Sequence, residues 1–471
     1  MNHDNENMKS IQRIAEKRSM YIDRNKYYYR DLTKFLRYNI PNGKNVLEIG
    51  CGIGYILDSV KPSRGVGIDI SPEMIKIAKN KYPNLEFLVM DAQNIELGEK
   101  FDFIIISDVL GYFEDVQKFL KSLARVCTPE TRIIFTYHNF LWAPMLGLAE
   151  MLNLKMRQAR LNWLNTNDLS NLLYLENYDV IKTGRRLLFP KYIPLLSNLL
   201  NRYIGQLPII NKLCLVNFVI ARINPDLSDK KDFSVSVVIP ARNEEGNIEN
   251  AIKRMPKLGS HTEIIFVEGN SSDNTYKEII RVYEKYKDQY DIKYAKQDGK
   301  GKGDAVRKGF ALAQGEILMI LDADLTVPPE DLSKFYQAIS SGRGEYINGS
   351  RLIYPMEKEA MRFLNMLGNK FFSIMFSWLL GQRLKDTLCG TKVLSRKNYQ
   401  SLIANRSYFG DFDPFGDFDL IFGSAKLNLK IVEVPIKYRA REYGDTNISR
   451  FTHGWLLLKM VVFAMNKIKF L

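Results

Sequence analysis

The chain has 471 residues, which is too long for one ordinary hydrophobic core and predicts two or three domains. Hydrophobic residues make up 46% and charged residues 25%, a globular composition that excludes a largely disordered protein. The 67 Lys and Arg residues outnumber the 53 Asp and Glu residues, and the resulting charge of +14 suits an anionic partner. Nucleic acid, an anionic membrane surface and a phosphorylated substrate all remain open on this ground alone.

Cysteine usage and apolar runs bear on the compartment. The four cysteines lie far apart and form no CxxC pair, so neither a zinc site nor a disulfide framework is expected, and a reducing, cytoplasmic compartment fits. The stretch MNHDNENMKSIQRIAEKRSM has no apolar core and is not expected to be a secretory signal. No apolar run approaches the roughly 18 residues that cross a bilayer, so any action at a membrane is expected from its surface.

Taken in chain order, two strand patterns each run into a polar loop. Residues 46–49 lead into GCGIG, and residues 235–239 lead into PARNEEGN. Strand and helix patterns alternate after both, which is typical of parallel α/β sheets. The polar stretch INPDLSDKKD separates the two halves. The sequence therefore predicts an α/β protein with two Rossmann-like domains, residues 1–227 and residues 228–471.

The first domain begins with NVLEIGCGIGYILDSV, which reads as a buried strand, a tight glycine turn and a helix. Glycines lack the Cβ atoms that would keep a ligand away from the backbone. Asp69 closes the next strand 19 residues after Gly50, the distance at which an acid reaches ribose hydroxyls in such a crevice. Two further strands end at Asp91 and Asp108, so polar residues gather at the carboxyl ends of the sheet.

The string EIGCGIG resembles motif I of class I S-adenosylmethionine (SAM) methyltransferases, over roughly residues 25–225. NAD binding is the competing interpretation, and the acid two residues before the first glycine favours SAM. The resemblance places Glu48 at the position of the family's acidic residue. It also implies ribose contacts for Asp69 and contacts with the adenine edge for Asp91 and Ala92. The expected cofactor-binding residues are Glu48, Gly50, Gly52, Gly54, Asp69, Asp91, Ala92 and Asp108.

The methyl acceptor is less defined by the sequence. Methyl transfer is an in-line displacement, so positioning does most of the catalysis and a base is needed only for an acceptor that must lose a proton. His138 follows the strand RIIFTY and is a candidate base, although we favour a solvated or capping residue at a strand end. The aromatic and basic segment RSMYIDRNKYYYRDLTKFLRYNIP predicts a helical lid, whose tyrosines either touch the cofactor or simply pack.

The second domain contains an apolar strand, ILMIL, that ends in Asp322-Ala323-Asp324. Two carboxylates at a strand end can hold Mg²⁺ or Mn²⁺, which commonly takes one or two carboxylates together with substrate phosphates. The cation would neutralise a departing diphosphate. Upstream, Lys300, Lys302 and Arg307 lie among glycines and offer cations to the same diphosphate.

These residues resemble the GT-A glycosyltransferases of family 2, and within them the dolichyl- or polyprenyl-phosphate sugar transferases, over about residues 234–455. PARNEE, DAD, GSR, DTLCGTK and FGDFDL carry the resemblance. It implies the GT-A fold, a nucleotide-sugar donor and nucleotide contacts from Asn243 and Glu244. Two departures leave the base contacts and the third metal contact open: Gly269 follows Glu268 where paired acids are common, and Leu325-Thr326 follows the DAD motif.

Family 2 enzymes invert the anomeric centre by direct displacement. A hydroxyl acceptor would need a carboxylate base, for which Asp417 and Asp419 are candidates, whereas a lipid phosphate is already anionic and would pair with arginines such as Arg439. Asp386 is expected to fix a loop near the sugar, and Cys389 to be a small buried residue. The expected catalytic residues are Asp322, Asp324, Asp417 and Asp419, with Asp322 and Asp324 as metal ligands. The expected substrate-binding residues are Pro240, Asn243, Glu244, Glu268, Lys302, Arg307, Asp322, Arg351, Asp386 and Arg441.

Three apolar stretches with basic edges predict peripheral contact with an anionic leaflet, at the inner face of the membrane: FFSIMFSWLLGQRLK, GWLLLKMVVFAMNKIKFL and LLFPKYIPLLSNLL. Core helices with solvated edges are the alternative. Nucleic acid binding is not expected, because the basic residues are dispersed. The leading hypothesis is a bifunctional enzyme that transfers a sugar to a polyprenyl phosphate or glycan and methylates a related compound. Two alternatives are a glycosyltransferase with a regulatory or inactive SAM domain, and a non-enzymatic scaffold at a membrane surface.

Overall fold

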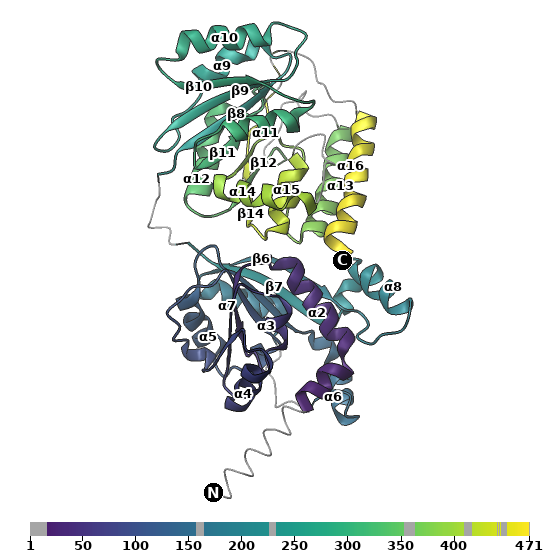
Figure 1. Ribbon diagram of the computed structural model, residues 1–471. Coiled ribbons are helices and arrows are strands. Elements are labelled where there is room, and N and C mark those ends of the chain that lie inside the picture. The colour runs from purple at the N-terminus through teal and green to yellow at the C-terminus, as the bar shows by residue number, and fades with distance from the viewer. Residues whose placement is uncertain are drawn as a thin grey trace, which may run out of the picture. The chain divides into compact units, whose positions relative to one another are not determined.

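The computed structural model describes residues 17–156, 164–225, 232–352, 363–408, 417–439, 441, 443 and 450–470 (Figure 1). Contacts divide these residues into two compact units, one ending at Asn224 and the other beginning at Pro225. The predicted boundary at residue 228 lies outside the described residues, and it stays a prediction.

The first unit is built on a seven-stranded sheet in the order β3-β2-β1-β4-β5-β7-β6. β1 to β5 are parallel, and β7 runs antiparallel to both β5 and β6. Chain order reverses between β1 and β4, and ligands of open α/β sheets bind at the carboxyl ends of the strands beside such a point. The strands are β1 (Asn45–Ile49), β2 (Arg64–Asp69), β3 (Glu86–Val89), β4 (Phe103–Ser107), β5 (Arg132–His138), β6 (Tyr178–Arg186) and β7 (Val216–Ile223).

Helices cover both faces of this sheet, and this explains why its central strands are apolar throughout. Leu47 and Ile104 pack into one buried cluster, and Val46 and Ile105 pack into another. Near the N-terminus, Ile22 packs against Ile53 of the glycine turn, so this helical segment lies beside that turn. The helices are α2 (Lys26–Asn39), α3 (Tyr55–Ser59), α4 (Pro72–Lys81), α5 (Val116–Leu123), α6 (Ala143–Met151), α7 (Thr166–Leu175) and α8 (Leu196–Arg202).

The second unit contains a seven-stranded sheet in the order β10-β9-β8-β11-β13-β12-β14. β8 lies in parallel between β9 and β11, while β13 is antiparallel to β11 and β12. The strands are β8 (Val235–Ala241), β9 (Thr262–Glu268), β10 (Asp291–Lys296), β11 (Ile317–Ile320), β12 (Tyr346–Ser350), β13 (Lys392–Ser395) and β14 (Ile431–Pro435). The predicted α/β class is thus confirmed. Both sheets are mixed rather than purely parallel, which the sequence did not predict because local patterns indicate strands but not their direction.

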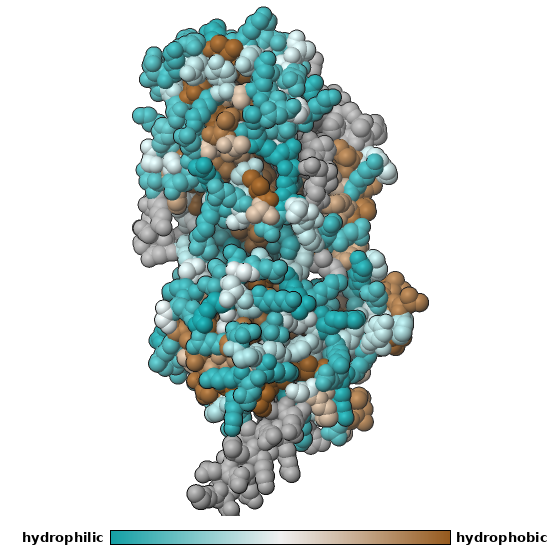
Figure 2. Space-filling view, viewed as in Figure 1, coloured by the Kyte–Doolittle hydropathy of each residue, from teal (hydrophilic) through white to brown (hydrophobic). Residues whose placement is uncertain are grey.

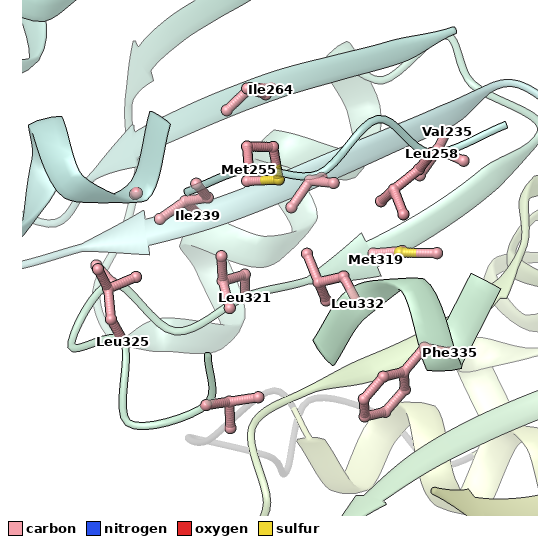
Figure 3. Close-up of a cluster of buried hydrophobic side chains, with 14 of the residues drawn as sticks. Val235, Ile239, Met255, Leu258, Ile264, Met319, Leu321, Leu325, Leu332 and Phe335 are labelled. Atoms are coloured by element: carbon pink, nitrogen blue, oxygen red, sulfur yellow. The ribbon is translucent and has the colours of Figure 1, made fainter. Parts of the chain in front are cut away.

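One core of the second unit packs β8 and β11 against α12, with Ile239, Leu321 and Phe335 among its members (Figure 3). A second core on the other face contains α11 and the paired helices α13 and α16, which lie side by side (Figure 1). No helix among the described residues is both long enough and apolar enough to cross a bilayer. The helices are α9 (Ile248–Lys253), α10 (Thr275–Tyr286), α11 (Lys302–Leu312), α12 (Leu332–Ser340), α13 (Phe363–Leu380), α14 (Arg396–Ala404), α15 (Asp417–Lys426) and α16 (Arg450–Ala464).

Candidate active sites

The glycine turn of the first unit follows β1 in a conformation that side chains disfavour. Gly50, Gly52 and Gly54 have φ angles of 69°, 52° and 79°, all in the left-handed region. A Cβ atom at Gly54 would lie 2.7 Å from the Phe87 ring, so a close approach within the fold requires that glycine. At Gly52 a Cβ atom would meet nothing within 4 Å, so this glycine faces open space where a ligand can approach the backbone.

Two carboxylates hold the turn through backbone hydrogen bonds. Asp69 at the end of β2 accepts from the Gly52 N–H at 2.8 Å and from the Ser71 N–H at 2.9 Å. Glu48 is 2% exposed and accepts from the Leu57 N–H at 2.9 Å. Burial raises the pKa of Glu48 well above its ordinary value. The predicted acids therefore lie around the glycine turn, where their hydrogen bonds fix its shape.

The remaining predicted residues of this unit lie at the neighbouring strand ends. After β3, Asp91 accepts from the Gln93 N–H at 2.9 Å and begins a short turn in which Ala92 is buried. After β4, Asp108 accepts a 2.6 Å hydrogen bond from the Tyr28 hydroxyl. His138 lies at the end of β5, with its ring 3.8 Å from the Asp108 carboxylate. The sequence pattern did not reveal that Tyr28, Asp108 and His138 meet.

In the second unit, Asp322 and Asp324 follow β11 and each carries a basic partner. Lys302 Nζ, at the start of α11, lies 2.6 Å from an Asp322 carboxylate oxygen. Arg441 Nη2 lies 2.7 Å from an Asp324 carboxylate oxygen. The other Asp324 oxygen accepts from the Thr326 N–H and hydroxyl at 3.1 and 2.9 Å. The two carboxylates predicted to hold a metal are therefore charge-balanced by side chains.

Electrostatics keep Asp322 ionised. Burial alone would raise the pKa of this carboxyl group, but the positive charge of Lys302, reinforced by Lys392 and Arg351, holds the pKa below its ordinary value. The segment DTLCGTK presses against this carboxylate, since a Cβ atom at Gly390 would lie 1.8 Å from an Asp322 oxygen. Only glycine fits there, and sequence analysis did not assign Gly390 a role.

Arg441 also joins the first loop of this unit to the carboxylate pair. Its Nη1 lies 3.0 Å from Glu244, whose second oxygen accepts from the Asn247 side chain at 2.7 Å. Burial raises the pKa of Glu244 to about 7, against the opposing charge of Arg441. Glu244, Asp324 and Arg441 thus form one charged cluster, built from segments far apart in the sequence.

The first and second loops are tied together beside this cluster. The Asn243 side-chain oxygen accepts from the Ser272 N–H at 2.8 Å, and the Ser271 hydroxyl accepts from the Asn243 N–H at 3.1 Å. Glu268, at the end of β9, is 3% exposed and accepts from the Ser271 N–H at 2.5 Å. Pro240 lies within β8, where it pairs with β9. These four predicted donor-binding residues (Asn243, Glu244, Glu268 and Pro240) follow or end adjacent strands.

Arg351 and Asp386 form a buried pair rather than two separate ligand contacts. Asp386 is fully buried and accepts from Arg351 Nε and Nη2 at 2.7 and 2.8 Å, and from the Arg351 N–H at 3.0 Å. It also accepts from the Asn369 side chain and the Leu388 N–H. Although burial opposes it, the Arg351 charge holds the pKa of Asp386 far below its ordinary value. These hydrogen bonds hold the start of the DTLCGTK segment, and the predicted place of Asp386 near the sugar stays a prediction.

Of the predicted base candidates, Asp419 lies together with Arg307 in another part of the second unit. Asp419 is 7% exposed and lies 3.1 Å from Arg406. Arg307 and Asp419 line one small cavity between α11, α14 and α15, and its lining includes neither Asp322 nor Asp324. The side chain of Asp417 lies outside the described residues. Cys389 is fully buried, and burial raises the pKa of its thiol to about 11.

The donor set at the end of β11 fits a hard divalent cation. Carboxylate oxygens are the ligands that Mg²⁺ and Mn²⁺ prefer, and one or two of them suffice when a substrate supplies phosphate oxygens. The ammonium of Lys302 and the guanidinium of Arg441 already occupy the space where positive charge would be held. Within the described part of the chain, no group of three or more His, Cys, Asp or Glu side chains is arranged around a common point.

Both units correspond to known families. Residues 21–183 match the family described as "Methyltransferase domain", and residues 236–401 match "Glycosyl transferase family 2". The chain therefore contains a methyltransferase domain followed by a family 2 glycosyltransferase domain, so the predicted combination of these two domain types is confirmed.

Relatives of the second unit include a dolichol-phosphate mannosyltransferase of Pyrococcus furiosus, 30% identical over 45% of this chain and 59% of that protein. A UDP-N-acetylglucosamine–dolichyl-phosphate N-acetylglucosaminyltransferase of Methanococcus voltae is 28% identical over 49% of this chain and 97% of the relative. The first unit is 39% identical to a putative methyltransferase of Invertebrate iridescent virus 6, over 18% of this chain and 34% of that protein. The chain thus spans little more than half of the Pyrococcus protein.

Proposed function

We propose that the second unit transfers a sugar, with inversion, from a nucleotide-sugar donor to a lipid phosphate, and that the first unit transfers a methyl group from SAM. The observation that carries the first half is the carboxylate pair after β11, with Lys302 and Arg441 beside it. Asp322 and Asp324 would hold a Mg²⁺ or Mn²⁺ ion, whose charge neutralises the departing diphosphate. Lys302 and Arg441, freed from the carboxylates, would then pair with the phosphate oxygens.

The position of Asp419 supports a lipid phosphate rather than a glycan hydroxyl as the sugar acceptor. A hydroxyl must lose a proton to a base, whereas a phosphate is already anionic and attacks directly. Asp419 is ion-paired with Arg406 in a cavity whose lining excludes the metal-binding pair, which does not favour it as that base. Two relatives named for dolichyl- or dolichol-phosphate transfer agree with this choice.

A labelled-sugar assay tests this half of the proposal. UDP-glucose, UDP-N-acetylglucosamine and GDP-mannose are offered in turn with phytanyl phosphate, with Mn²⁺ or with EDTA. We expect metal-dependent label in the lipid with one of the donors, and thermal stabilisation of the chain by that nucleotide with Mn²⁺. Absence of both effects with all three donors would favour the non-enzymatic scaffold.

The methyl half rests on the glycine turn. Gly52 faces open space, and Asp69 holds its N–H, so an adenosyl ligand can lie against the backbone there. The alternative is a unit that binds SAM without transferring methyl groups. Methyl transfer from labelled SAM, with Asp69→Ala as the control, separates these two, because a regulatory unit would bind SAM without consuming it.

We propose that the protein acts at the cytoplasmic face of a membrane. The segment between β6 and β7 supports this, because polar side chains of this segment are buried while several of its leucines are exposed. Two polar residues of α8 point inward, while Asn198 is exposed. Ser197 is fully buried and donates to the Lys191 carbonyl at 2.7 Å. Asn201 bonds both the N–H and the carbonyl of Phe189, each at 2.8 Å. Apolar side chains point outward, with Leu195 89% exposed and Leu199 50% exposed.

Figure 2 shows a hydrophobic patch where Figure 1 labels α8. Between Lys182 and Arg222 the chain carries seven Lys or Arg residues and no acid. An apolar surface with basic surroundings matches the interface of an anionic leaflet. The pair α13 and α16 adds exposed apolar residues, among them Ile374 and Trp455.

A further inference from the structure

A cluster of polar side chains lies beside the glycine turn and takes no part in the steps above. Asp108 follows β4 and His138 ends β5, and Tyr28 on α2 contacts both through a 2.6 Å hydrogen bond and a ring separation of 5.9 Å. A Cβ atom at Gly50 would lie 2.4 Å from the side chain of Val109, the residue after Asp108. The cluster therefore adjoins the proposed methyl-donor site.

One carboxylate oxygen of Asp108 is buried without a hydrogen-bond partner, which destabilises the fold. Asp108 Oδ1 is buried, accepts no hydrogen bond and faces His138 Nδ1 at 3.8 Å. The backbone of Asp108 is held at a φ of 56°, in the left-handed region, by a 2.9 Å hydrogen bond from its N–H to the Thr136 carbonyl. Strained backbone and unpartnered buried oxygens both destabilise a fold, and they concentrate where a site must present a particular atom.

The other members of the cluster are proton donors. Burial, with the Asp108 charge adding to it, raises the pKa of Tyr28 well above its ordinary value, and burial also raises the pKa of Tyr29. Both hydroxyls therefore stay neutral at working pH and can donate a hydrogen bond but cannot take up a proton. The Arg18 guanidinium adds a positive charge that acts on Asp108 and on both tyrosines. Asp108 and His138, 3.8 Å apart, are the other ionisable side chains of the cluster.

We propose that His138, oriented by Asp108, is the general base that takes the proton when a carbohydrate hydroxyl is methylated by SAM, an inference that rests on the SAM-dependent function proposed above. Asp108 Oδ1 lies 3.8 Å from Nδ1, so a small approach of the two side chains would let Nδ1 donate to the carboxylate and leave Nε2 to accept a proton. The acceptor oxygen forms its bond to the methyl carbon as the carbon–sulfur bond breaks, and that electron pair returns to sulfur. The hydroxyl proton passes to Nε2, and the Asp108 carboxylate stabilises the imidazolium.

The need for a base selects the class of acceptor. Thiols and carboxylic acids ionise readily without a strong base. An alcohol hydroxyl keeps its proton until attack and needs the base. Tyr112 is 45% exposed on the same side of the sheet, after β4, and offers an aromatic face of the kind that packs against sugar rings. A chain that also carries a sugar transferase domain has such hydroxyls in its product.

The test uses the full chain with [methyl-³H]SAM and three probes: octyl β-D-glucopyranoside, octyl α-D-mannopyranoside and the 2-amino-2-deoxy glucoside. Fragmentation in a mass spectrometer locates the methyl group on oxygen or nitrogen. We expect O-methylation of a glycoside. His138→Gln lowers kcat about 100-fold or more with little change in KM. Free imidazole restores part of the rate to His138→Gly, which a structural role would not allow.

S-adenosylhomocysteine binding, measured by equilibrium dialysis, is the second readout. His138→Gln is expected to bind it within about twofold of wild type, while Asp108→Asn is expected to lower kcat with the KM for the glycoside unchanged. His261→Gln is the matched control, because it removes an exposed His–Asp pair, 2.8 Å apart, in the other unit. Methyl groups on nitrogen only, unlabelled glycosides, or a His138→Gln chain as fast as wild type would overturn the inference. A wild-type chain that fails to bind S-adenosylhomocysteine overturns the proposed methyltransferase function as well.

Discussion

The two units differ in the main partners of the carboxylates at their candidate sites. In the first unit, Glu48 and Asp69 accept hydrogen bonds from backbone N–H groups of their own loop. In the second unit, Asp322 and Asp324 are paired with the side chains of Lys302 and Arg441. Backbone hydrogen bonds can stay in place when a ligand arrives, whereas side-chain ion pairs must be exchanged for new ones.

This difference matches the proposed ligands. An adenosyl group offers hydroxyls and a flat ring, which a shaped backbone can recognise at close range. A nucleotide diphosphate with a cation brings several charges, which need charged partners on the protein. The first site is therefore expected to respond most to changes in backbone geometry, and the second to changes in charge.

The largest expected effect is on sugar transfer. Asp324→Ala removes a proposed metal ligand and leaves Arg441 with one fewer partner, so the rate of sugar transfer should fall about 10³-fold or more. The labelled-sugar assay measures it, with binding of S-adenosylhomocysteine as the control for intact folding of the first unit. A rate within tenfold of wild type would remove Asp324 from the metal site.

The next largest effect is expected on stability, at the buried pair of Arg351 and Asp386. Asp386→Ala leaves the Arg351 guanidinium buried without its carboxylate and should lower the free energy of unfolding by about 3–5 kcal/mol. Urea unfolding of the second unit, followed by intrinsic fluorescence, measures the change. Asp291→Ala breaks the exposed pair with His261 and should cost about 1 kcal/mol or less. Equal effects of the two variants would contradict the burial argument.

The glycine turn offers a matched comparison. Gly52 and Gly43 both have φ in the left-handed region, 52° and 74°, and both have open space where a Cβ atom would lie. Alanine at either position should destabilise the chain by about 1–2 kcal/mol. Only Gly52→Ala should also weaken binding of S-adenosylhomocysteine, by about tenfold or more, because only Gly52 faces the proposed ligand. The same loss of affinity in both variants would indicate general strain rather than ligand contact.

A pH effect is expected from Glu244. Its folded-state pKa of about 7 lies above the ordinary value of 4.5, so between these values the folded chain holds a proton that the unfolded chain has lost. This contribution to stability is fully present below about pH 4.5 and disappears as the pH rises through 7. The melting temperature, measured without metal ions, should therefore fall as the pH rises from about 4.5 to about 7. The Glu244→Gln variant should show a smaller fall over the same range. An unchanged pH profile in Glu244→Gln would assign the dependence to other groups.

The smallest effect is expected at the membrane. Leu195→Asp combined with Leu199→Asp should reduce co-sedimentation with vesicles of phosphatidylcholine and phosphatidylglycerol severalfold, because it places charges on the proposed lipid-facing surface. Tyr174→Asp with Leu175→Asp is the control, since both residues are exposed on α7, 77% and 57%, outside the α8 segment. If both pairs reduce binding equally, the contact is not specific to α8.

Local sequence patterns predicted the parts of each site that are built within one loop. The glycine turn and the Asp322/Asp324 pair each follow a single apolar strand, and chain spacing alone places them at the edge of a sheet. The two families and the α/β class followed from these patterns and are confirmed by the comparisons. The individual roles of the site residues stay predictions.

Contacts between distant segments could not be predicted in the same way. Tyr28 is 80 residues from Asp108, and Arg441 is 197 residues from Glu244, so no periodicity or spacing connects them. Arg351 is one of the predicted substrate-binding residues, and no spacing in the sequence indicates that its side chain pairs with Asp386. Such pairings depend on how strands and loops pack, which a single sequence does not specify.

The side chain of Arg441 connects two carboxylates of the candidate donor site. A single guanidinium joins Glu244 to Asp324, and two residues earlier the Arg439 N–H donates to the Thr326 carbonyl at 3.0 Å. Any ligand that takes over both carboxylates must first displace this arginine. Binding at these two carboxylates would therefore be coupled to release of the Arg441 side chain from the loop that follows β8.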